Sequence, residues 1–468
     1  MMTLKQASNW VSAPQLVGES VVDIKRVTTD TRSLQPGDLF VALKGDKFDA
    51  HDFLTQAKAS GAVAAIAEHG LVQAGLSGLQ VSDSKQALGQ LAGGWRSQFE
   101  LPLIAVTGSN GKTTVTQMVA SILQAFKPAQ SFATKGNLNN DIGVPLTLLG
   151  LTNAHRIGVV ELGMNHPGEI ALLAHMVKPA VALVNNAQRE HLEFMGTVEA
   201  VAHENGAVID ALGADGVAVF PADDDYTPVW KQKSGLRPML TFAMTGDADV
   251  TANAVWTGAL WEVAAKTPRG PLAFTLDIAG EHNVKNALAA TACALAAGIP
   301  LECISQGLSG FEPVKGRSHA VRLQLKGHHF TLIDDTYNAN PDSMRAAIDV
   351  LAALPGPRLL VMGDMGEVGH LGPHFHEEAG RWAHAQGIRN LFTFGPQSIL
   401  ASQVFVSCGP GQGQHFESIT ELMAAVARQL QSVSSVLVKG SRFMKMERVV
   451  MSIQEQVREQ DQERGVAC

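Results

Sequence analysis

Short, nearly uninterrupted apolar runs alternate along this chain with longer stretches in which apolar residues recur at helical spacing. Examples of the short runs are LIAV at 103–106, IGVV at 157–160 and LLVM at 359–362. Apolar runs without polar residues are typical of strands that are buried on both faces of a parallel sheet, with helices covering those faces. The pattern therefore predicts an α/β protein.

The alternation repeats in three successive stretches. The first is compact and ends at the polar segment VSDSKQ, and the second contains a β-rich part at about 237–280 that we expect to form an antiparallel extension. Pro313 and Gly316 interrupt two helical patterns, which marks a boundary before the third stretch. The third begins with a hairpin at 320–335 and continues as a Rossmann-like unit. We predict three α/β domains in series, the central one with a mostly parallel sheet: residues 1–86, 87–313 and 314–468.

The composition and net charge limit the classes of molecule that this protein is expected to bind. The 468 residues are 46% hydrophobic and 17% charged, as in a soluble α/β protein, and the formal net charge is −8 without any basic tract. Nucleic acid and anionic membrane are therefore excluded as main partners. The longest apolar run, 288–297, falls well short of the roughly 18 residues that a membrane span requires. The N-terminus has no secretory signal pattern, so we predict a cytoplasmic location.

The four cysteines, Cys293, Cys303, Cys408 and Cys468, include no CxxC pair. They are too few for a disulfide framework, and we expect ordinary thiols in a reducing compartment.

The segment VTGSNGKTT at 106–114 carries the main chemical signal, because it lies between a predicted strand and a predicted helix. Glycines let successive backbone N–H groups close around phosphate oxygens, and the following helix adds the positive end of its dipole. We expect Lys112 to reach the β/γ-phosphates and Thr113 to present its hydroxyl to a magnesium ion. The predicted nucleotide-binding residues of this loop are Gly108, Ser109, Asn110, Gly111, Lys112, Thr113 and Thr114.

The common P-loop needs a glycine at position 106, where this chain has Val106. The loop present is the shorter T-G-x-N-G-K-T-T, and a chance Gly-Lys-Thr in a surface turn is disfavoured by the strand and helix around it. The short form resembles the loop of the Mur ligase and folylpolyglutamate synthase superfamily. That resemblance implies an ATP-dependent enzyme that forms amide bonds.

Two further side chains are expected near this loop. Glu161 ends the strand-like segment GVVE, and His191 follows the next one, at the edge of a parallel sheet where ligands collect. Alone, a strand-end glutamate is more often a solvated carboxylate, and a single histidine rarely indicates metal. The resemblance to Mur ligases implies that both lie around a second magnesium ion.

Two more segments match the superfamily. EHNVKNALAATACALA, from Glu281, places Asn283 and Asn286 on one helix face, where two amides can address a purine edge and a phosphate. The alternative is a helix start with polar caps. Further on, KGRS and DDTYNANPDS contain Arg317 and Asp335, for which the resemblance implies contacts with ATP. The alternative for these two is a solvated arginine and an N-cap aspartate.

The resemblance extends to nearly the whole chain, because three further segments also match the family: GNLNNDIGVPLTLL (136–149), VMGDMGEVG (361–369) and VLVKGSRFMKME (436–447). It points to the branch of the Mur ligase family that joins D-alanyl-D-alanine to a UDP-N-acetylmuramoyl-tripeptide through an acyl phosphate, in peptidoglycan precursor synthesis. The resemblance implies a monomer that uses ATP and Mg²⁺, with Lys112, His191 and Arg317 as catalytic residues. It further implies substrate contacts by Thr31, Arg32 and Ser33 with UDP, by Asn137, Asn139 and Asn140 with the peptide, and by Asn338 and Asn340 with the dipeptide.

Other functions stay open. Within the superfamily they are the diamino-acid-adding ligase, which NANPDSM disfavours, and folylpolyglutamate synthase, which the UDP-type N-terminal segment disfavours. From another class, a P-loop kinase or NTP-driven switch would carry a similar loop. The third residue of the tripeptide, diaminopimelate or lysine, is left undecided by the sequence.

One position departs from the family pattern. Mur ligases usually carry a lysine that is carbamylated and serves the second magnesium site, and aligning VAHENGAVI on Gly206 places Asn205 there. An amide cannot be carbamylated and carries no charge. We expect this enzyme to work without a carbamate, with Glu204 or His203 as alternatives for compensation or as ordinary exposed helix residues.

Overall fold

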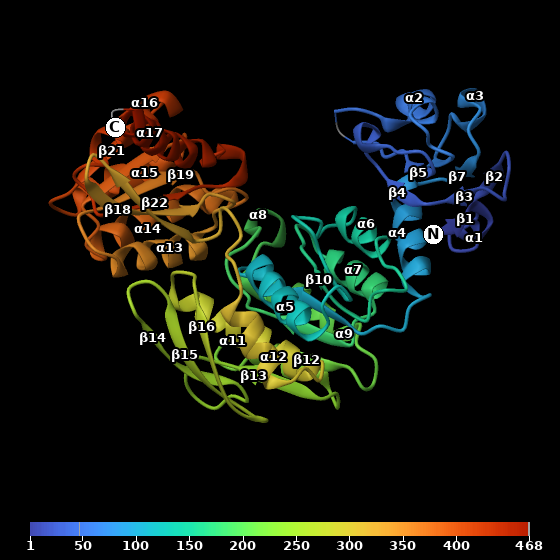
Figure 1. The fold of residues 1–468 in the computed structure, drawn as a ribbon, viewed down its shortest axis with the longest axis horizontal. Coiled ribbons are helices and arrows are strands. Elements are labelled where there is room, and N and C mark those ends of the chain that lie inside the picture. The colour runs from blue at the N-terminus through green and yellow to red at the C-terminus, as the bar shows by residue number, and fades with distance from the viewer. Residues whose placement is uncertain (46, 467–468) are drawn as a thin grey trace.

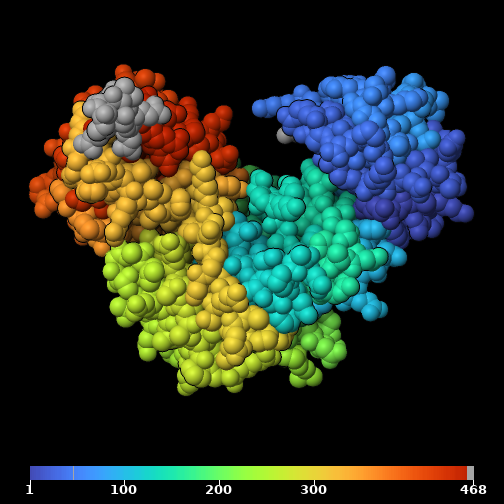
Figure 2. All heavy atoms as spheres, in the orientation of Figure 1, coloured from blue at the N-terminus to red at the C-terminus, as the bar shows by residue number. Residues whose placement is uncertain are grey.

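A computed structural model describes residues 1–45 and 47–466 of the protein, so Cys468 lies outside the described residues. Three α/β units follow one another along the chain, and the N-terminal and C-terminal units flank the central one (Figure 1). In the space-filling view these two units stand apart, with a broad hollow between them above the central unit (Figure 2). The predicted order of three α/β units is thus observed.

The N-terminal unit is built on a five-stranded sheet of order β2-β7-β6-β5-β4, in which the pairs from β4 to β7 are parallel. A small antiparallel pair, β1 with β3, lies beside it. Its elements are β1 (Met2–Thr3), α1 (Leu4–Ser8), β2 (Gln15–Val17), β3 (Asp23–Ile24), β4 (Arg26–Thr28), η1 (Thr31–Ser33), β5 (Asp38–Val41), η2 (Ala50–Phe53), α2 (Leu54–Ala59), β6 (Ala64–Ala67), α3 (Leu71–Ala74) and β7 (Gly78–Gln80).

The central unit holds a six-stranded sheet of order β13-β12-β11-β8-β10-β9, and all of its neighbouring strands are parallel, as predicted. The strands are buried apolar runs because helices cover both faces. Its elements are β8 (Leu103–Thr107), α5 (Lys112–Phe126), β9 (Ser131–Ala133), α6 (Gly143–Leu148), β10 (Ile157–Glu161), α7 (Glu169–Val177), β11 (Val181–Val184), α8 (Leu192–Met195), α9 (Val198–Asp210), β12 (Val217–Pro221), α10 (Thr227–Ser234), β13 (Met239–Phe242), α11 (Glu281–Ala296) and α12 (Leu301–Ser309).

The predicted antiparallel extension is also present. Strands β14 (Thr251–Trp256), β15 (Trp261–Thr267) and β16 (Gly270–Leu276) pair antiparallel in that order. Buried and exposed residues alternate along β15 and β16, as in a sheet with one face on the core.

The C-terminal unit contains a six-stranded sheet of order β17-β18-β22-β19-β20-β21. The predicted hairpin is formed by β17 and β18 and turns at Gly327, whose φ of 83° suits a residue without Cβ; the other strands are parallel. Its elements are β17 (His319–Leu325), β18 (His328–Asp335), α13 (Pro341–Ala353), β19 (Arg358–Gly363), η3 (Gly369–Leu371), α14 (Gly372–Ala385), β20 (Asn390–Phe394), α15 (Ser398–Ser407), β21 (Gln412–Phe416), α16 (Ile419–Gln429), β22 (Ser435–Lys439), η4 (Arg442–Met444) and α17 (Glu447–Val466).

Helix α4 (Ser84–Arg96) joins the first two units, and the predicted limit between residues 86 and 87 falls within it. Gly94 lies so close to Trp10 that a Cβ would sit 2.1 Å from the indole ring. At the other end, the buried Arg96 donates to the carbonyl oxygens of Leu101 and Val177. One hydrophobic core runs through the N-terminal unit, α4 and one face of the central sheet. The domain limits themselves stay a prediction.

Within the described part of the chain, no helix is long and apolar enough to cross a membrane. The cysteines that the structure describes, Cys293, Cys303 and Cys408, are free thiols. Cys293 is fully buried in α11, and this burial raises the pKa of its thiol.

Candidate active site

The loop between β8 and α5 has the predicted strand–loop–helix geometry. The strand ends at Thr107 and the helix begins at Lys112. Gly108 and Gly111 have φ values of 131° and 80°, which disfavour residues with a Cβ. A Cβ on Gly111 would lie 2.5 Å from Oδ1 of Asn286, so the close approach of α11 also requires glycine there. Backbone N–H groups at the start of a helix are thereby turned toward one cavity, as phosphate binding needs.

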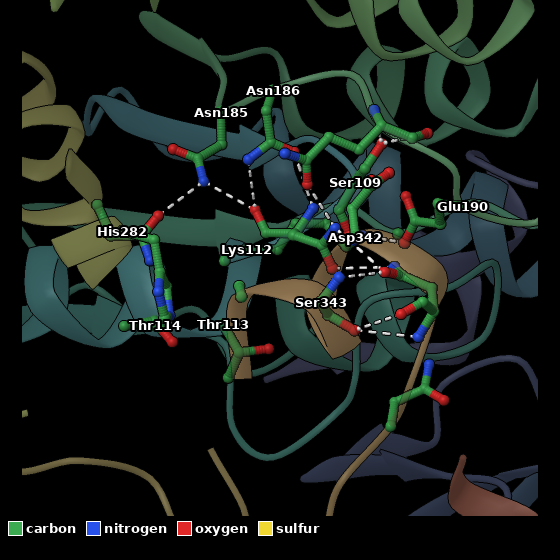
Figure 3. A pocket seen from close by; sticks show the side chains of 18 of the residues that line it. Ser109, Lys112, Thr113, Thr114, Asn185, Asn186, Glu190, His282, Asp342 and Ser343 are labelled. Carbon is green, nitrogen blue, oxygen red and sulfur yellow. Dashed lines mark hydrogen bonds and ion pairs between the residues drawn. The ribbon is translucent and has the colours of Figure 1, made fainter. Parts of the chain in front are cut away.

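That cavity has a volume of about 890 Å³ and is lined by both the central and the C-terminal unit (Figure 3). It brings together most of the residues predicted from sequence for ATP, metal and peptide. Those that line it are Ser109, Asn110, Gly111, Lys112, Thr113, Thr114, Asn137, Asn139, Asn140, Glu161, His191, Asn283, Asn286, Arg317, Asp335, Asn338 and Asn340.

Lys112 is turned back onto its own loop. Its Nζ donates to the carbonyl oxygens of Gly108 and Ser109, at 2.6 and 3.0 Å, and forms an ion pair of 2.6 Å with Oε1 of Glu190. The other oxygen of Glu190, Oε2, is buried and has no hydrogen-bond partner among the described residues. A phosphate group must therefore compete with Glu190 for the ammonium of Lys112.

Glu161 lies at the end of β10 and is almost completely buried. Oγ1 of Thr113 donates to its Oε1 at 3.0 Å, and Nδ2 of Asn139 donates to the same oxygen at 2.7 Å. A hydroxyl and a carboxylate thus meet where the loop, β10 and the asparagine-rich segment converge. Oxygen ligands of this kind suit magnesium.

His191 is the residue just before α8 and has a left-handed φ of 49°. Its Nδ1 lies 2.6 Å from Oε2 of Glu367 in the C-terminal unit, and its Nε2 lies 3.6 Å from Oε1 of Glu190. The contact with His191 lowers the pKa of Glu367. His191 is therefore placed between carboxylates of two units.

A chain of amides ties α11 to the phosphate loop. Nδ2 of Asn286 donates to Oδ1 of Asn283 at 3.0 Å, which confirms that the two share one helix face. Oδ1 of Asn286 accepts from Nδ2 of Asn185, which also donates to the carbonyl of Asn110. Both asparagines of α11 are buried, so they hold the loop in place as well as lining the cavity.

The C-terminal unit contributes charged and aromatic groups. Oδ2 of Asp335 accepts from Nζ of the buried Lys439 at 2.6 Å, and Oδ1 accepts from the backbone of Ser318. The guanidinium of Arg317 lies 4.1 Å from the ring centre of Tyr337. Asp335 thus fixes the start of β17 and Lys439, while Arg317 lies along the cavity wall.

Three predicted substrate residues have local roles in the structure. Oδ1 of Asn140 accepts from the backbone N–H of Gly143, at the start of α6. Asn340 caps α13 and also donates from Nδ2 to Oδ1 of Asn110 at 2.9 Å, which links the C-terminal unit to the phosphate loop. Oδ1 of Asn338 accepts a hydrogen bond from the backbone N–H of Ala339, and its backbone carbonyl oxygen accepts one from Nζ of Lys439.

The three residues predicted to contact UDP lie elsewhere. Thr31, Arg32 and Ser33 form the short helix η1 in the N-terminal unit, and they are not among the residues that line the cavity. Arg32 is exposed and pairs with Asp30, whose pKa the Arg32 hydrogen bonds lower to about 2.

The position of the expected lysine is buried. Oδ1 of Asn205 accepts from Oγ1 of Thr107, at the end of β8, and its Nδ2 has no partner among the described residues. Neither suggested compensation is placed to act at the phosphate loop. Glu204 accepts from the backbone N–H groups of Gly168 and Ile170, and therefore caps α7, while His203 is exposed. His203 is therefore an exposed helix residue, as the alternative states, whereas Glu204 is half-buried and holds the start of another helix.

Several cavity residues were missed by the sequence reasoning. The rule that ligands collect at the carboxyl ends of parallel strands was applied to Glu161 and His191 only. If it had been applied to every polar residue that follows β11, and to the end of β22, it would have found a further set: Asn185, Asn186, Arg189, Glu190 and Lys439.

Comparisons with known proteins agree along the whole chain. Family models match it in three stretches: "Mur ligase family, catalytic domain" at 23–96, "Mur ligase middle domain" at 106–294, and "Mur ligase, glutamate ligase domain" at 321–442. The UDP-N-acetylmuramoyl-tripeptide–D-alanyl-D-alanine ligase of Escherichia coli is 41% identical, over 97% of this chain and 98% of that protein. The chain belongs to the Mur ligase family.

Solved structures of other Mur ligases have the same fold. MurF from Acinetobacter baumannii superposes with a TM-score of 0.89 at 36% identity, over 97% of this chain and 98% of that one. MurF from Thermotoga maritima, solved in complex with ADP, has a TM-score of 0.82 at 26% identity, over 93% and 98% of the two chains. The predicted family and fold class are confirmed, and the chain is a ligase, as expected.

Proposed function

We propose that this Mur ligase joins D-alanyl-D-alanine to a UDP-N-acetylmuramoyl-tripeptide with consumption of ATP, in the synthesis of peptidoglycan precursors. The main support is the identity of 41% to the Escherichia coli ligase of that name, which extends over nearly the full length of both chains. The cavity provides the second support, because it combines a phosphate loop with polar groups from a separate unit.

The reaction has two steps in this proposal. The terminal carboxylate of the tripeptide attacks the γ-phosphorus of ATP, which releases ADP and gives an acyl phosphate. The amine of the dipeptide then attacks the acyl carbon, an amide bond forms, and phosphate leaves with the loss of a proton from nitrogen. Such transfers depend mainly on positioning and on neutralising the charge of the phosphoryl group.

Lys112 has the central catalytic role. Its ammonium leaves Glu190 and binds the β/γ-phosphates, while the N–H groups of Gly111 and its neighbours hold the phosphate oxygens. Arg317 acts from the C-terminal unit on the phosphates or ribose, with its guanidinium packed on Tyr337. Asn283 and Asn286 face the nucleotide, and Asp335 contributes through the position that it gives to Lys439.

The residues fit magnesium as a cofactor. Thr113 and Glu161 offer oxygen ligands, His191 a ring nitrogen, and the unpartnered buried oxygen of Glu190 adds negative charge to the same cavity. When bound, magnesium supplies charge neutralisation on the phosphates. Asn205 adds none, so we propose that the site works without a carbamate.

Each outer unit takes one substrate in this proposal. Thr31, Arg32 and Ser33 in the N-terminal unit hold UDP, and the segment with Asn137, Asn139 and Asn140 guides the peptide toward the cavity. Asn338 and Asn340 face the dipeptide. We further propose that the enzyme acts as a monomer in the cytoplasm.

A phosphate-release assay tests the proposal. The protein is incubated with ATP, magnesium, D-alanyl-D-alanine and the UDP-muramoyl-tripeptide carrying either diaminopimelate or lysine at its third position. Release that needs both acceptors, together with a product of the summed mass minus water, is expected. Release that is indifferent to the dipeptide would point to a kinase or NTP-driven switch and refute the ligase.

A further inference from the structure

An arginine of the central unit reaches into the C-terminal unit. Arg189 lies between β11 and α8, and its Nε donates to Oδ1 of Asp342 at 3.0 Å. Its Nη1 donates to Oε2 of Glu378 at 2.8 Å, and its Nη2 donates to both carboxylates. The backbone N–H of the same residue donates to Oδ2 of Asp342 at 2.8 Å. One residue therefore binds two helices of the other unit, α13 and α14.

The surroundings of this cluster favour strong interaction. The side chains of Arg189 and Asp342 are each 22% exposed, and that of Glu378 is 33% exposed, so water screens the charges only in part. The guanidinium also lies 5.2 Å from the ring centre of Phe375. The planar guanidinium group has several N–H donors and can donate hydrogen bonds to two carboxylates at once. The ammonium group of a lysine cannot do so with the same geometry.

Helix α13 carries the contact to the phosphate loop. Asp342 lies in its first turn, and Asn340, which caps that turn, exchanges amide hydrogen bonds with Asn110 at 2.9 and 3.4 Å. Asn110 belongs to the phosphate loop, and Ser343 and Asp342 line the same cavity (Figure 3). Holding Asp342 therefore also holds the wall of the cavity that the C-terminal unit supplies.

Two other polar side-chain contacts across this boundary are weaker. The pair of His191 with Glu367 depends on the protonation of a histidine, and the pair of Asn110 with Asn340 is uncharged. Arg189 is the contact with a permanent charge and two anionic partners.

We propose that Arg189 is a positioning residue that docks the C-terminal unit onto the central unit, so that the two walls of the nucleotide cavity are assembled together. The inference rests on the proposed function for its effect on turnover, but its structural part is independent of it. Asp342 and Glu378 are the docking partners, and the hydrogen bonds that the guanidinium of Arg189 makes with described residues all go to these two carboxylates.

The test compares Arg189→Ala and Arg189→Lys with wild type, and uses Arg381→Ala as a matched control. Arg381 lies on α14, the helix that carries Glu378, but it is exposed, and its ion pair among the described residues is with Glu377 one turn away. Small-angle X-ray scattering of the ligand-free proteins reports the separation of the units. Turnover is measured against ATP and against the dipeptide.

We expect a larger radius of gyration for Arg189→Ala, and turnover lowered on the order of 30-fold or more, as when one partner of a hydrogen-bonded charge pair is truncated. The KM for the UDP substrate, which other units bind, stays within about twofold, as expected when uniform binding is untouched. Arg189→Lys should give a radius of gyration and a turnover between those of wild type and Arg189→Ala. Arg381→Ala should match wild type in both measurements.

Three results would overturn the proposal: scattering and turnover both unchanged, scattering changed with normal turnover, or turnover lost with unchanged scattering. The last would place Arg189 at the chemistry itself. If Arg189→Ala fails to fold, Asp342→Asn combined with Glu378→Gln removes the same pairing from the other side. If wild type lacks the proposed activity, the scattering comparison still decides the docking role.

Discussion

Replacing Glu190 with glutamine should tighten the binding of nucleotide. In the structure, Nζ of Lys112 lies 2.6 Å from Oε1 of Glu190, and the two side chains are only 14% and 10% exposed. Nucleotide binding must exchange this ion pair for a phosphate contact, and the carboxylate also repels the incoming phosphates. Glu190→Gln keeps the shape and an acceptor oxygen but removes the charge.

The magnitude follows from the difference between a charged and a neutral hydrogen bond. The net contribution is about 1.5–3 kcal/mol for the former and about 0.5–1.5 kcal/mol for the latter. Releasing Lys112 from glutamine therefore costs roughly 1–1.5 kcal/mol less, which corresponds to about a tenfold lower dissociation constant.

Isothermal titration of ADP, in the presence of EDTA, measures this effect without any contribution from magnesium. Glu193→Gln serves as the control, because it makes the same charge change three residues away on an exposed side chain outside the cavity. An affinity of Glu190→Gln equal to or weaker than that of wild type would refute the view that Glu190 competes with phosphate for Lys112.

Four further outcomes are expected. Lys112→Ala should lower turnover by two to three decades, or about 3–4 kcal/mol, with the fold retained by circular dichroism, and near-normal turnover would reject the phosphate-loop assignment. Arg317→Ala should lower turnover while calorimetry finds the dissociation constant of the UDP substrate unchanged; the reverse pattern would move Arg317 to another site. Because Asn205 cannot be carbamylated, turnover should not depend on bicarbonate or carbon dioxide, whereas rescue by bicarbonate would contradict the absence of a carbamate. Since burial raises the pKa of the Cys293 thiol, iodoacetamide followed by peptide mapping should modify the exposed Cys408 in the native protein and Cys293 only after unfolding, and native labelling of Cys293 would disprove its burial.

The sequence predicted those parts of the fold and site that depend on local pattern. The strand, glycine loop and helix around Gly108 and Gly111 follow from residues within one short segment, and so does the hairpin at Gly327. Glu161 was placed near the phosphate loop because it ends an apolar strand, while its role at a metal came from the resemblance to the family. Such signals need no knowledge of which distant segments meet.

Contacts between distant segments were not predicted. Arg189 and Asp342 are 153 positions apart, and Arg189 and Glu378 are 189 apart, so no periodicity connects them. Lys112 and Glu190 are 78 positions apart, and their pairing turns the lysine side chain away from the direction expected for phosphate binding. In these cases the packing of whole units decides which charges meet, and a single sequence carries no direct record of that packing.

The core shared through α4 has a consequence for how the protein can be divided. Leu88 and Leu91 are fully buried in a core to which both the N-terminal unit and the central sheet contribute. A fragment that ends at residue 86 would lose these side chains and leave Trp10 without the helix against which it packs. A fragment that starts there would keep the contact of α4 with Met176 but would expose the side of the same helix that packs on Trp10. The N-terminal unit is thus inseparable from its neighbour, and only the C-terminal unit, with hydrophobic clusters largely its own, has the anatomy of an independent module.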